Sequence, residues 1–453
     1  MEDDLTIFDL LLGPLYVFII WIIANNIKNK NIFKNPEYKY FIYGLMAKIV
    51  GAVALGLVYF YYYKGGDTIN YYETAKAYDN LFFKNQGDFW RGWLGDASGV
   101  DHYFFDASTG YPTYHPPDKH AFFVVRLLIP LLALSFKSYF ACAVLVAALS
   151  FTGAWKLYQV FIIEFPNLKK QLAIAILFIP SCVFWGSGLM KDSFTLSAVG
   201  WFTYSFYFFF IKKQRKIHFL IYVFISATIV LAIKPYIFFA LLPGSLLWMS
   251  NNYIKKIDNR VFRAIASPVI VSLGALAGYF ALQQMGDSLG KYKLDKVLDE
   301  AVIVQQDMKA EYYEGKTFDI GNFDASASGV LAKAPEAIFA GIFRPGIWDV
   351  KNVLMAVSSL ENTYLLILTL FLLIRLKFIG FFKYIGKNPM VLFSVLFSLF
   401  FAFSVGLTVA NFGSLVRLRI PELPFFVASL FIIRDLYEQA KRNRYKVRIK
   451  PVP

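Results

Sequence analysis

The chain has 453 residues, of which 57% are hydrophobic and only 17% are charged, and its mean hydropathy is +0.50. The apolar residues lie in long runs separated by short charged clusters, a pattern that excludes a soluble globular domain. The net charge of +15 does not predict nucleic-acid binding, because the lysines and arginines recur in short loops between the apolar runs.

The apolar runs predict an all-α polytopic membrane protein, because one crossing needs roughly 20 apolar residues. The acidic start, Met1-Glu2-Asp3-Asp4, is unlike the basic start of a cleavable signal peptide, so the first run is expected to stay as a helix. About eleven spans are predicted, at 6–27, 41–63, 138–163, 171–187, 193–211, 217–233, 236–250, 264–284, 353–375, 389–410 and 414–434.

The basic clusters predict the orientation of these spans. All six fall on one side of the membrane if the N-terminus lies outside and the C-terminus lies in the cytoplasm. The clusters are Lys28 to Lys39, Lys169 and Lys170, Lys212 to Lys216, Lys255 to Arg263, Arg375 to Lys387, and Arg434 to Lys450.

The chain is predicted to be one transmembrane domain, 1–453, with two long outer loops at 64–120 and 285–350. The first loop is expected to carry interfacial helices. The apolar stretch 121–136 would invert every later loop if it were a span, and it contains Arg126 and Pro130. It is therefore predicted to be a helix on the outer face or dipping into it; the alternative is a twelfth span.

The first outer loop opens with Gly65-Gly66-Asp67, followed by Tyr71 and Glu73. Asp67 would lie at the outer membrane boundary, where a carboxylate can act as general base for a sugar hydroxyl. The alternative is that Asp67 is only the N-cap of a helix.

A second motif, Pro180 to Ser193, joins two predicted spans on the outer side and contains Trp185 and Lys191-Asp192. Charges at membrane depth usually mark function, although a Lys-Asp pair can also simply end a hairpin.

Arginines near the outer face form the third and fourth candidates. Arg417 and Arg419 lie in the last predicted span with Pro421 and Pro424, which make a regular helix doubtful. Arg344 precedes the ninth span. Arginine suits phosphate because its fork donates two hydrogen bonds, whereas the simpler reading for Arg417 and Arg419 is snorkelling to the interface.

Aromatic residues near these motifs are candidates for contact with sugar, namely Tyr71, Trp185 and Trp348; for Trp348, interfacial anchoring is an equal alternative. Lys234-Pro235-Tyr236, at an outer turn, is a weaker fifth candidate. The sequence has no phosphate-binding glycine loop of the nucleotide-hydrolase kind and no HExxH motif. No cofactor is predicted, and a divalent metal held by Asp67 and other loop carboxylates stays open.

Three stretches resemble bacterial O-antigen and exopolysaccharide repeat-unit polymerase-like membrane proteins: Gly66-Asp67 with Tyr71-Tyr72, Pro180-Ser181 to Lys191-Asp192, and Asn411 to Pro421. The wider group is the GT-C glycosyltransferases. The resemblance implies a GT-C-like fold in the bacterial inner membrane and a polyprenyl-phosphate or diphosphate sugar as donor. It also implies that Asp67 is the base, with Glu73 as a nearby alternative.

These observations predict a membrane glycosyltransferase or polysaccharide polymerase in which Arg417, Arg419, Arg344 and Lys191 hold the anionic leaving group. Its partners would be a polyprenyl-linked glycan, the lipid bilayer and other envelope-assembly proteins, with no nucleic acid. The alternatives are a monomer-adding GT-C transferase, a lipid or glycan transporter, and a non-enzymatic subunit of a larger membrane assembly.

Overall fold

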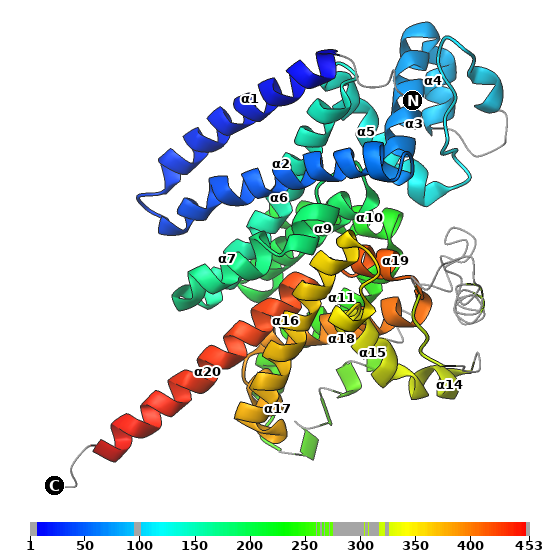
Figure 1. The fold of residues 1–453 in the computed structure, drawn as a ribbon. Helices are drawn as coiled ribbons and strands as arrows, with labels where there is room; N and C mark the ends of the chain where they lie inside the picture. The colour runs from blue at the N-terminus through cyan, green and yellow to red at the C-terminus, as the bar shows by residue number, and fades with distance from the viewer. Residues whose placement is uncertain are drawn as a thin grey trace. The chain divides into compact units, whose positions relative to one another are not determined.

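The protein is all-helical in the part of the chain that the structure describes (Figure 1). This structure, a computed structural model, describes residues 7–94, 101–259, 317–321 and 326–449, with a few residues between 261 and 307. Within these residues the only β-type pairing is an isolated bridge between Thr317 and Asn411. The predicted all-α class is therefore confirmed.

Six helical segments of the described chain are long and apolar enough to cross a membrane, which makes this a multi-pass membrane protein. Two further apolar helices, Ile217–Ile233 and Ala334–Phe343, are shorter. The six candidate spans are Leu11–Asn31, Pro36–Tyr62, Tyr139–Glu164, Lys191–Ile211, Met355–Leu376 and Pro389–Thr408.

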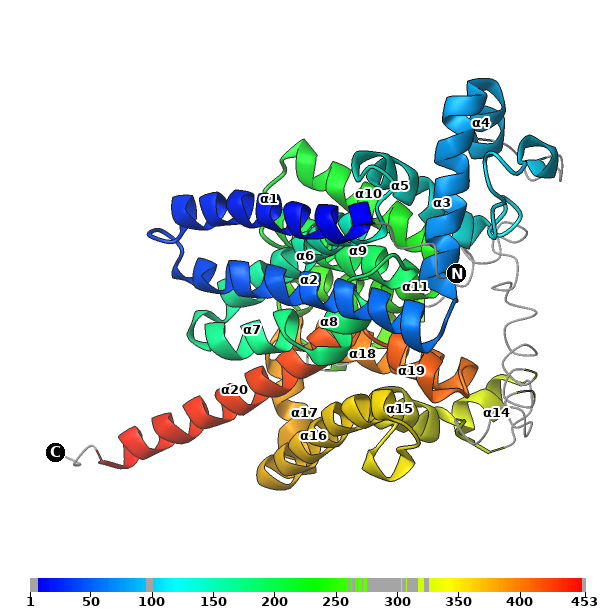
Figure 2. The same cartoon turned by 45° about the horizontal axis from the view of Figure 1, so that its top comes forward.

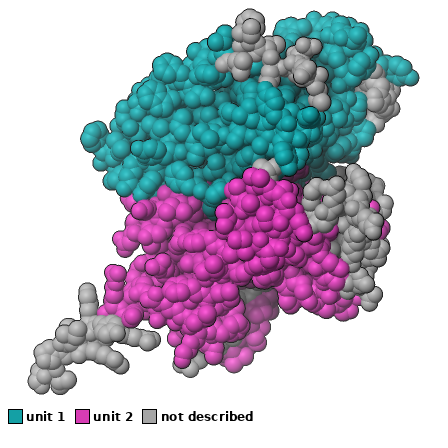
Figure 3. Space-filling model, in the orientation of Figure 1, with its two compact units in different colours: residues 1–161, 177–209, 214–234 teal, residues 162–176, 210–213, 235–453 magenta. Residues whose placement is uncertain are grey.

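The chain divides into two compact units (Figure 3). Unit 1 comprises residues 1–161, 177–209 and 214–234, and unit 2 comprises 162–176, 210–213 and 235–453.

Unit 1 is built on long apolar helices, of which α1 and α2 form a hairpin (Figure 2). Glycines let α6 and α9 approach closely: a Cβ at Gly153 would lie 2.1 Å from the carbonyl oxygen of Ser197. Asp9 of α1 binds the start of α6, accepting a hydrogen bond from the Tyr139 N–H at 2.9 Å. The helices are α1 (Ile7–Asn31), α2 (Phe41–Leu57), α3 (Asp67–Lys84), α4 (Gln86–Leu94), α5 (Lys119–Leu134), α6 (Tyr139–Glu164), α8 (Pro180–Trp185), α9 (Lys191–Phe206) and α10 (Ile217–Ile233).

Unit 2 packs α15 against α18 through small residues. A Cβ at Gly406 would lie 2.0 Å from the carbonyl oxygen of Ala337, so only glycine permits this approach. The unit contains nearly all of α7 (Lys169–Leu177), and then α11 (Pro235–Ile254), α14 (Ala327–Ala332), α15 (Ala334–Phe343), α16 (Val353–Leu376), α17 (Phe378–Lys387), α18 (Pro389–Thr408), α19 (Phe412–Leu418) and α20 (Leu423–Ile449).

Two predicted spans are not single helices. The span at 171–187 is interrupted between Leu177 and Pro180, because proline cannot donate a helix hydrogen bond and holds Ile179 in an extended conformation. The span at 414–434 is interrupted between α19 and α20, where the irregularity expected from Pro421 and Pro424 is found.

Two other predicted elements have different outcomes. The span at 264–284 lies mostly outside the described residues. The helix expected at 121–136 is α5, with Pro130 inside it. Its place relative to the membrane stays a prediction.

Candidate functional site

The predicted site residues belong to both units. Unit 1 contains Asp67, Tyr71, Glu73, Trp185 and Lys191, and unit 2 contains Arg344, Trp348, Arg417 and Arg419. The grouping of Lys191 with the three arginines as one diphosphate site therefore stays a prediction.

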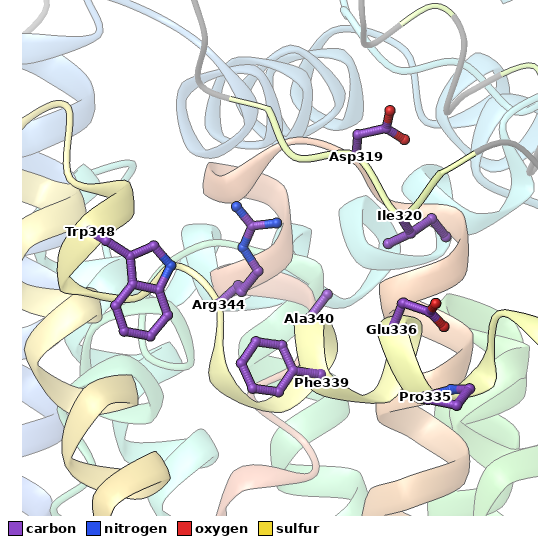
Figure 4. Close-up of a pocket in the computed structure, with 8 residues that line it drawn as sticks. All are labelled: Asp319, Ile320, Pro335, Glu336, Phe339, Ala340, Arg344 and Trp348. Carbon is purple, nitrogen blue, oxygen red and sulfur yellow. The ribbon is translucent and has the colours of Figure 1, made fainter.

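Unit 2 has a surface groove of about 600 Å³ in front of Arg344 (Figure 4), called here the Arg344 groove. Figure 4 shows Trp348 and Glu336 on opposite sides of Arg344. The groove lies over the α15 helix and the segment that follows it. Its lining residues are Asp319, Ile320, Pro335, Glu336, Phe339, Ala340, Arg344 and Trp348.

Arg344 is held rigidly at this groove. Its Nε and Nη2 donate to the two carboxylate oxygens of Asp349, at 3.2 and 2.7 Å. The rings of Phe318 and Phe412 lie 5.3 and 5.0 Å from the guanidinium carbon, within cation–π range. Nη1 makes no hydrogen bond to the described residues, so one edge of the fork stays open for an acceptor.

Carboxylates and aromatic rings complete the groove. Asp319 and Glu336 are exposed, and Glu336 lies in the first turn of α15, where the helix dipole favours a negative charge. Trp348 is 58% exposed and its ring packs over Gly346, where an added Cβ would lie 2.4 Å away. The groove thus combines one cation, which is paired with Asp349, with two exposed acids and aromatic surface.

Arg419 lies under this segment and is fully buried. Its Nη1 donates to the carbonyl oxygens of Ile342 and Arg344, at 3.0 and 2.9 Å, and more weakly to Gly341, while Nη2 donates to Oδ1 of Asn362. It therefore caps the C-terminal end of α15 from the break between α19 and α20. Arg419 does not line the groove, and its bonds indicate that it positions Arg344.

Arg417 lies on α19, two residues from Arg419, and is half-buried. It does not line the Arg344 groove. Its role as a phosphate ligand stays a prediction.

In unit 1, Asp67 begins α3 after a turn that needs glycine. Lys64, Gly65 and Gly66 all have positive φ, and Gly66 has φ 105° and ψ −166°, a region that other residues rarely enter. The helix starts one residue earlier than a capping role for Asp67 requires: Gly66 is the N-cap and Asp67 is the first helical residue. The alternative that Asp67 is an N-cap is therefore wrong.

Tyr114 covers Asp67. Its hydroxyl donates to Oδ1 of Asp67 at 3.2 Å, and its ring stacks on Tyr71 at 4.5 Å. The backbone N–H groups of Thr113 and Tyr114 donate to the buried hydroxyl of Thr74, which fixes this loop on α3. Burial, followed by the charge of Asp67, raises the pKa of Tyr114, so the phenol stays a neutral donor at physiological pH.

The other two predicted site residues of α3, Tyr71 and Glu73, differ from Asp67 in burial or in direction around the helix axis. Tyr71 is only 2% exposed, beneath Tyr114. Glu73 is half-buried and, six residues after Asp67, lies about 120° away around the helix axis. Asp67 and Glu73 therefore do not present their carboxylates on one face.

Sequence reasoning missed Lys48, which is buried within α2. Its Nζ donates to the carbonyl oxygens of Cys182 and Gly186, at 2.9 and 2.7 Å, and to the Ser150 hydroxyl at 3.3 Å. It thereby caps the end of α8. The signal was available, because a lysine inside an apolar run is uncommon and costly unless its charge is bound.

Asp192 has a partner that the sequence did not indicate, Lys234. It is buried at the start of α9 and forms an ion pair with Lys234, which ends α10 and is also buried. Lys191 is half-buried, and Trp185 is buried at the end of α8. Lys234, a weaker candidate in the sequence, is therefore one partner of a buried ion pair.

Removal of one partner of this pair should destabilise the protein strongly. Lys234→Met leaves Asp192 as a buried charge, so we expect the free energy of unfolding to fall by about 3 kcal/mol. The double variant Asp192→Asn with Lys234→Met should recover part of that loss. Thermal unfolding of the purified protein in detergent measures both; equal stability of Lys234→Met and the unaltered protein would contradict a stabilising pair.

Among the described residues, no three His, Cys, Asp or Glu side chains lie close enough to hold a metal ion. No family model matches the chain, and neither a curated protein nor a solved structure matches it.

Proposed function

We propose that this chain is a multi-pass membrane glycosyltransferase of the polysaccharide-polymerase type, acting on polyprenyl-(di)phosphate-linked glycans at the outer face of the bacterial inner membrane. The observation that carries the proposal is the Arg344 groove, in which a fixed arginine, two exposed carboxylates and two exposed aromatic rings line one cavity. These groups are suited to a phosphate, an acceptor hydroxyl and a sugar ring respectively.

In the proposed reaction, an acceptor hydroxyl oxygen forms a bond to the anomeric carbon of the donor sugar. The bond from that carbon to the lipid-linked phosphate breaks, and the phosphate leaves with the electron pair. The open edge of Arg344 stabilises the charge that develops on the leaving group. A carboxylate takes the proton of the hydroxyl. Within the groove this is Asp319 or Glu336, whereas the sequence motif favours Asp67.

The proposal includes the topology of about eleven spans with the N-terminus outside. The six candidate spans and the interrupted helices at 171–187 and 414–434 are compatible with that count.

The test of the function is glycan analysis of a host that lacks the gene, complemented by the unaltered protein. A polymerase makes a ladder of repeat units, and its loss leaves single lipid-linked units. A monomer-adding transferase instead removes one sugar from the profile. An unchanged glycan profile in the deletion strain would overturn the proposal.

Substitution of Asp67 separates the two assignments of the base. If Asp67 is the base, Asp67→Asn should lower polymer formation by about 10²–10⁴-fold at normal protein level, because asparagine cannot take a proton. Tyr114→Phe, which removes the hydrogen bond to Asp67 but keeps the ring, is the matched variant. A fully active Asp67→Asn with inactive Glu336→Gln or Asp319→Asn would move the base to the groove.

A transporter for lipid-linked glycans is the second candidate, and the interrupted helices favour it. Each unit has a helix break beside a buried cation, Lys48 at the end of α8 in unit 1 and Arg419 between α19 and α20 in unit 2. Discontinuous helices with buried charges are typical of transporters. Lipid-linked units confined to the inner leaflet in the deletion strain would select this function.

A further inference from the structure

A second cavity, of about 480 Å³, lies in unit 1 between α5, α6, α9 and α10. It is called here the α9 groove. Two of these helices belong to candidate membrane spans, and the outer face of α10 is apolar and exposed, for example at Phe224 and Ile225. The groove therefore opens on a surface that is suited to lipid rather than to water.

The groove is largely apolar, although six of its lining residues carry a hydroxyl group. Five of these hydroxyls already donate their proton to a backbone carbonyl oxygen, at 2.5–3.0 Å. The phenol of Tyr222 is the sixth, so the lining has few donors for an occupant and suits a hydrocarbon chain better than a sugar. The five residues with bonded hydroxyls are Ser150, Thr152, Ser193, Ser197 and Ser226.

One end of the groove carries an unneutralised cation. Lys156 follows the lining residue Thr152 by one turn of α6 and precedes the end of that helix by about 12 Å. Its Nζ lies over the rings of Trp201 and Tyr204, at 5.2 and 4.4 Å, and it makes no ion pair or hydrogen bond within the described part of the chain. A charged lysine inside a candidate span is costly in free energy unless it binds an anion or reaches water, so an anion is expected near Lys156.

We propose that the α9 groove binds one acyl chain of an anionic phospholipid, with the lipid phosphate at Lys156. The apolar lining holds the chain, and the ammonium group, set against Trp201 and Tyr204, holds the headgroup. This inference does not depend on the proposed enzymatic function, because it uses none of the residues assigned to that site.

The test is titration of the full chain in detergent with phosphatidylglycerol or phosphatidylcholine, followed by native mass spectrometry. We expect one tightly retained lipid, with about fivefold preference for phosphatidylglycerol. Lys156→Met should remove the preference and Lys156→Arg should keep it. Equal binding of the two lipids by the unaltered protein would overturn the headgroup assignment.

A substitution that fills the α9 groove tests whether the acyl chain of the lipid binds there. Ser197→Phe puts a ring into the groove and should abolish the retained lipid, whereas Thr228→Phe, exposed on α10 outside the lining, should not. Equal lipid retention by the two variants would overturn the proposal. So would a dimer of the unaltered chain that Ser197→Phe dissociates, because a second copy would then occupy the groove.

Discussion

Replacement of Arg344 by glutamine should lower polymer formation by about 10²–10³-fold while the protein level in the membrane stays normal. Glutamine keeps a polar side chain but removes the charge and the open Nη1 edge that we assign to the leaving phosphate. The measurement is the polysaccharide ladder of the complemented deletion strain, together with the amount of single lipid-linked repeat units, which should rise.

Two controls keep this result interpretable. Lys351→Gln removes an exposed cation seven residues away and should leave the ladder intact. The double variant Arg344→Gln with Asp349→Asn removes the partner charge as well, so that no unpaired buried carboxylate remains. If the double variant is well folded and makes a normal ladder, Arg344 has no part in the reaction.

Replacement of Arg419 by leucine should lower the free energy of unfolding by at least about 5 kcal/mol, because several buried acceptors lose their donor at once. These acceptors are the carbonyl oxygens at the end of α15 and Oδ1 of Asn362. We expect a protein that is scarce in the membrane. The measurements are its steady-state level and its thermal unfolding in detergent.

Graded variants test the capping role directly. Arg419→Lys keeps the charge but not the planar fork, so its stability should lie between those of the leucine variant and the unaltered protein. Arg434→Leu, an exposed change on the same helix as the last predicted span, should alter the free energy of unfolding by less than about 0.5 kcal/mol. A stable, abundant Arg419→Leu protein would show that the cap contributes little.

Apolar run length was enough to predict most helices. α1, α6 and α18 begin and end within a few residues of the predicted spans, because a run of about 20 apolar residues has few other stable states in lipid. The same criterion missed the break between Leu177 and Pro180, since the residues on both sides of it are apolar and only Pro180 marks the interruption. The break between α19 and α20 could be anticipated, because Pro421 and Pro424 lie within the apolar run.

In the candidate site, contacts between residues close in sequence could be predicted, whereas contacts between distant residues could not. Arg344 could be found from the sequence because its motif is local, with Asp349 five residues away. Tyr114, by contrast, meets Asp67 across 47 residues, and Arg419 meets the backbone of Arg344 across 75, so spacing along the chain carries no sign of either contact. Lys234 meets its partner Asp192 across 42 residues, so the spacing gives no sign of that ion pair either.

The cap on α15 has a mechanical consequence. A single guanidinium clamps the main chain of Arg344 to the interruption between α19 and α20, so the groove's cation and the kink in the last helical stretch move as one piece. Any force that straightens or bends that kink is therefore transmitted to the groove as a displacement of its charge. Conversely, a substrate that displaces Arg344 would shift the N-terminal end of α20.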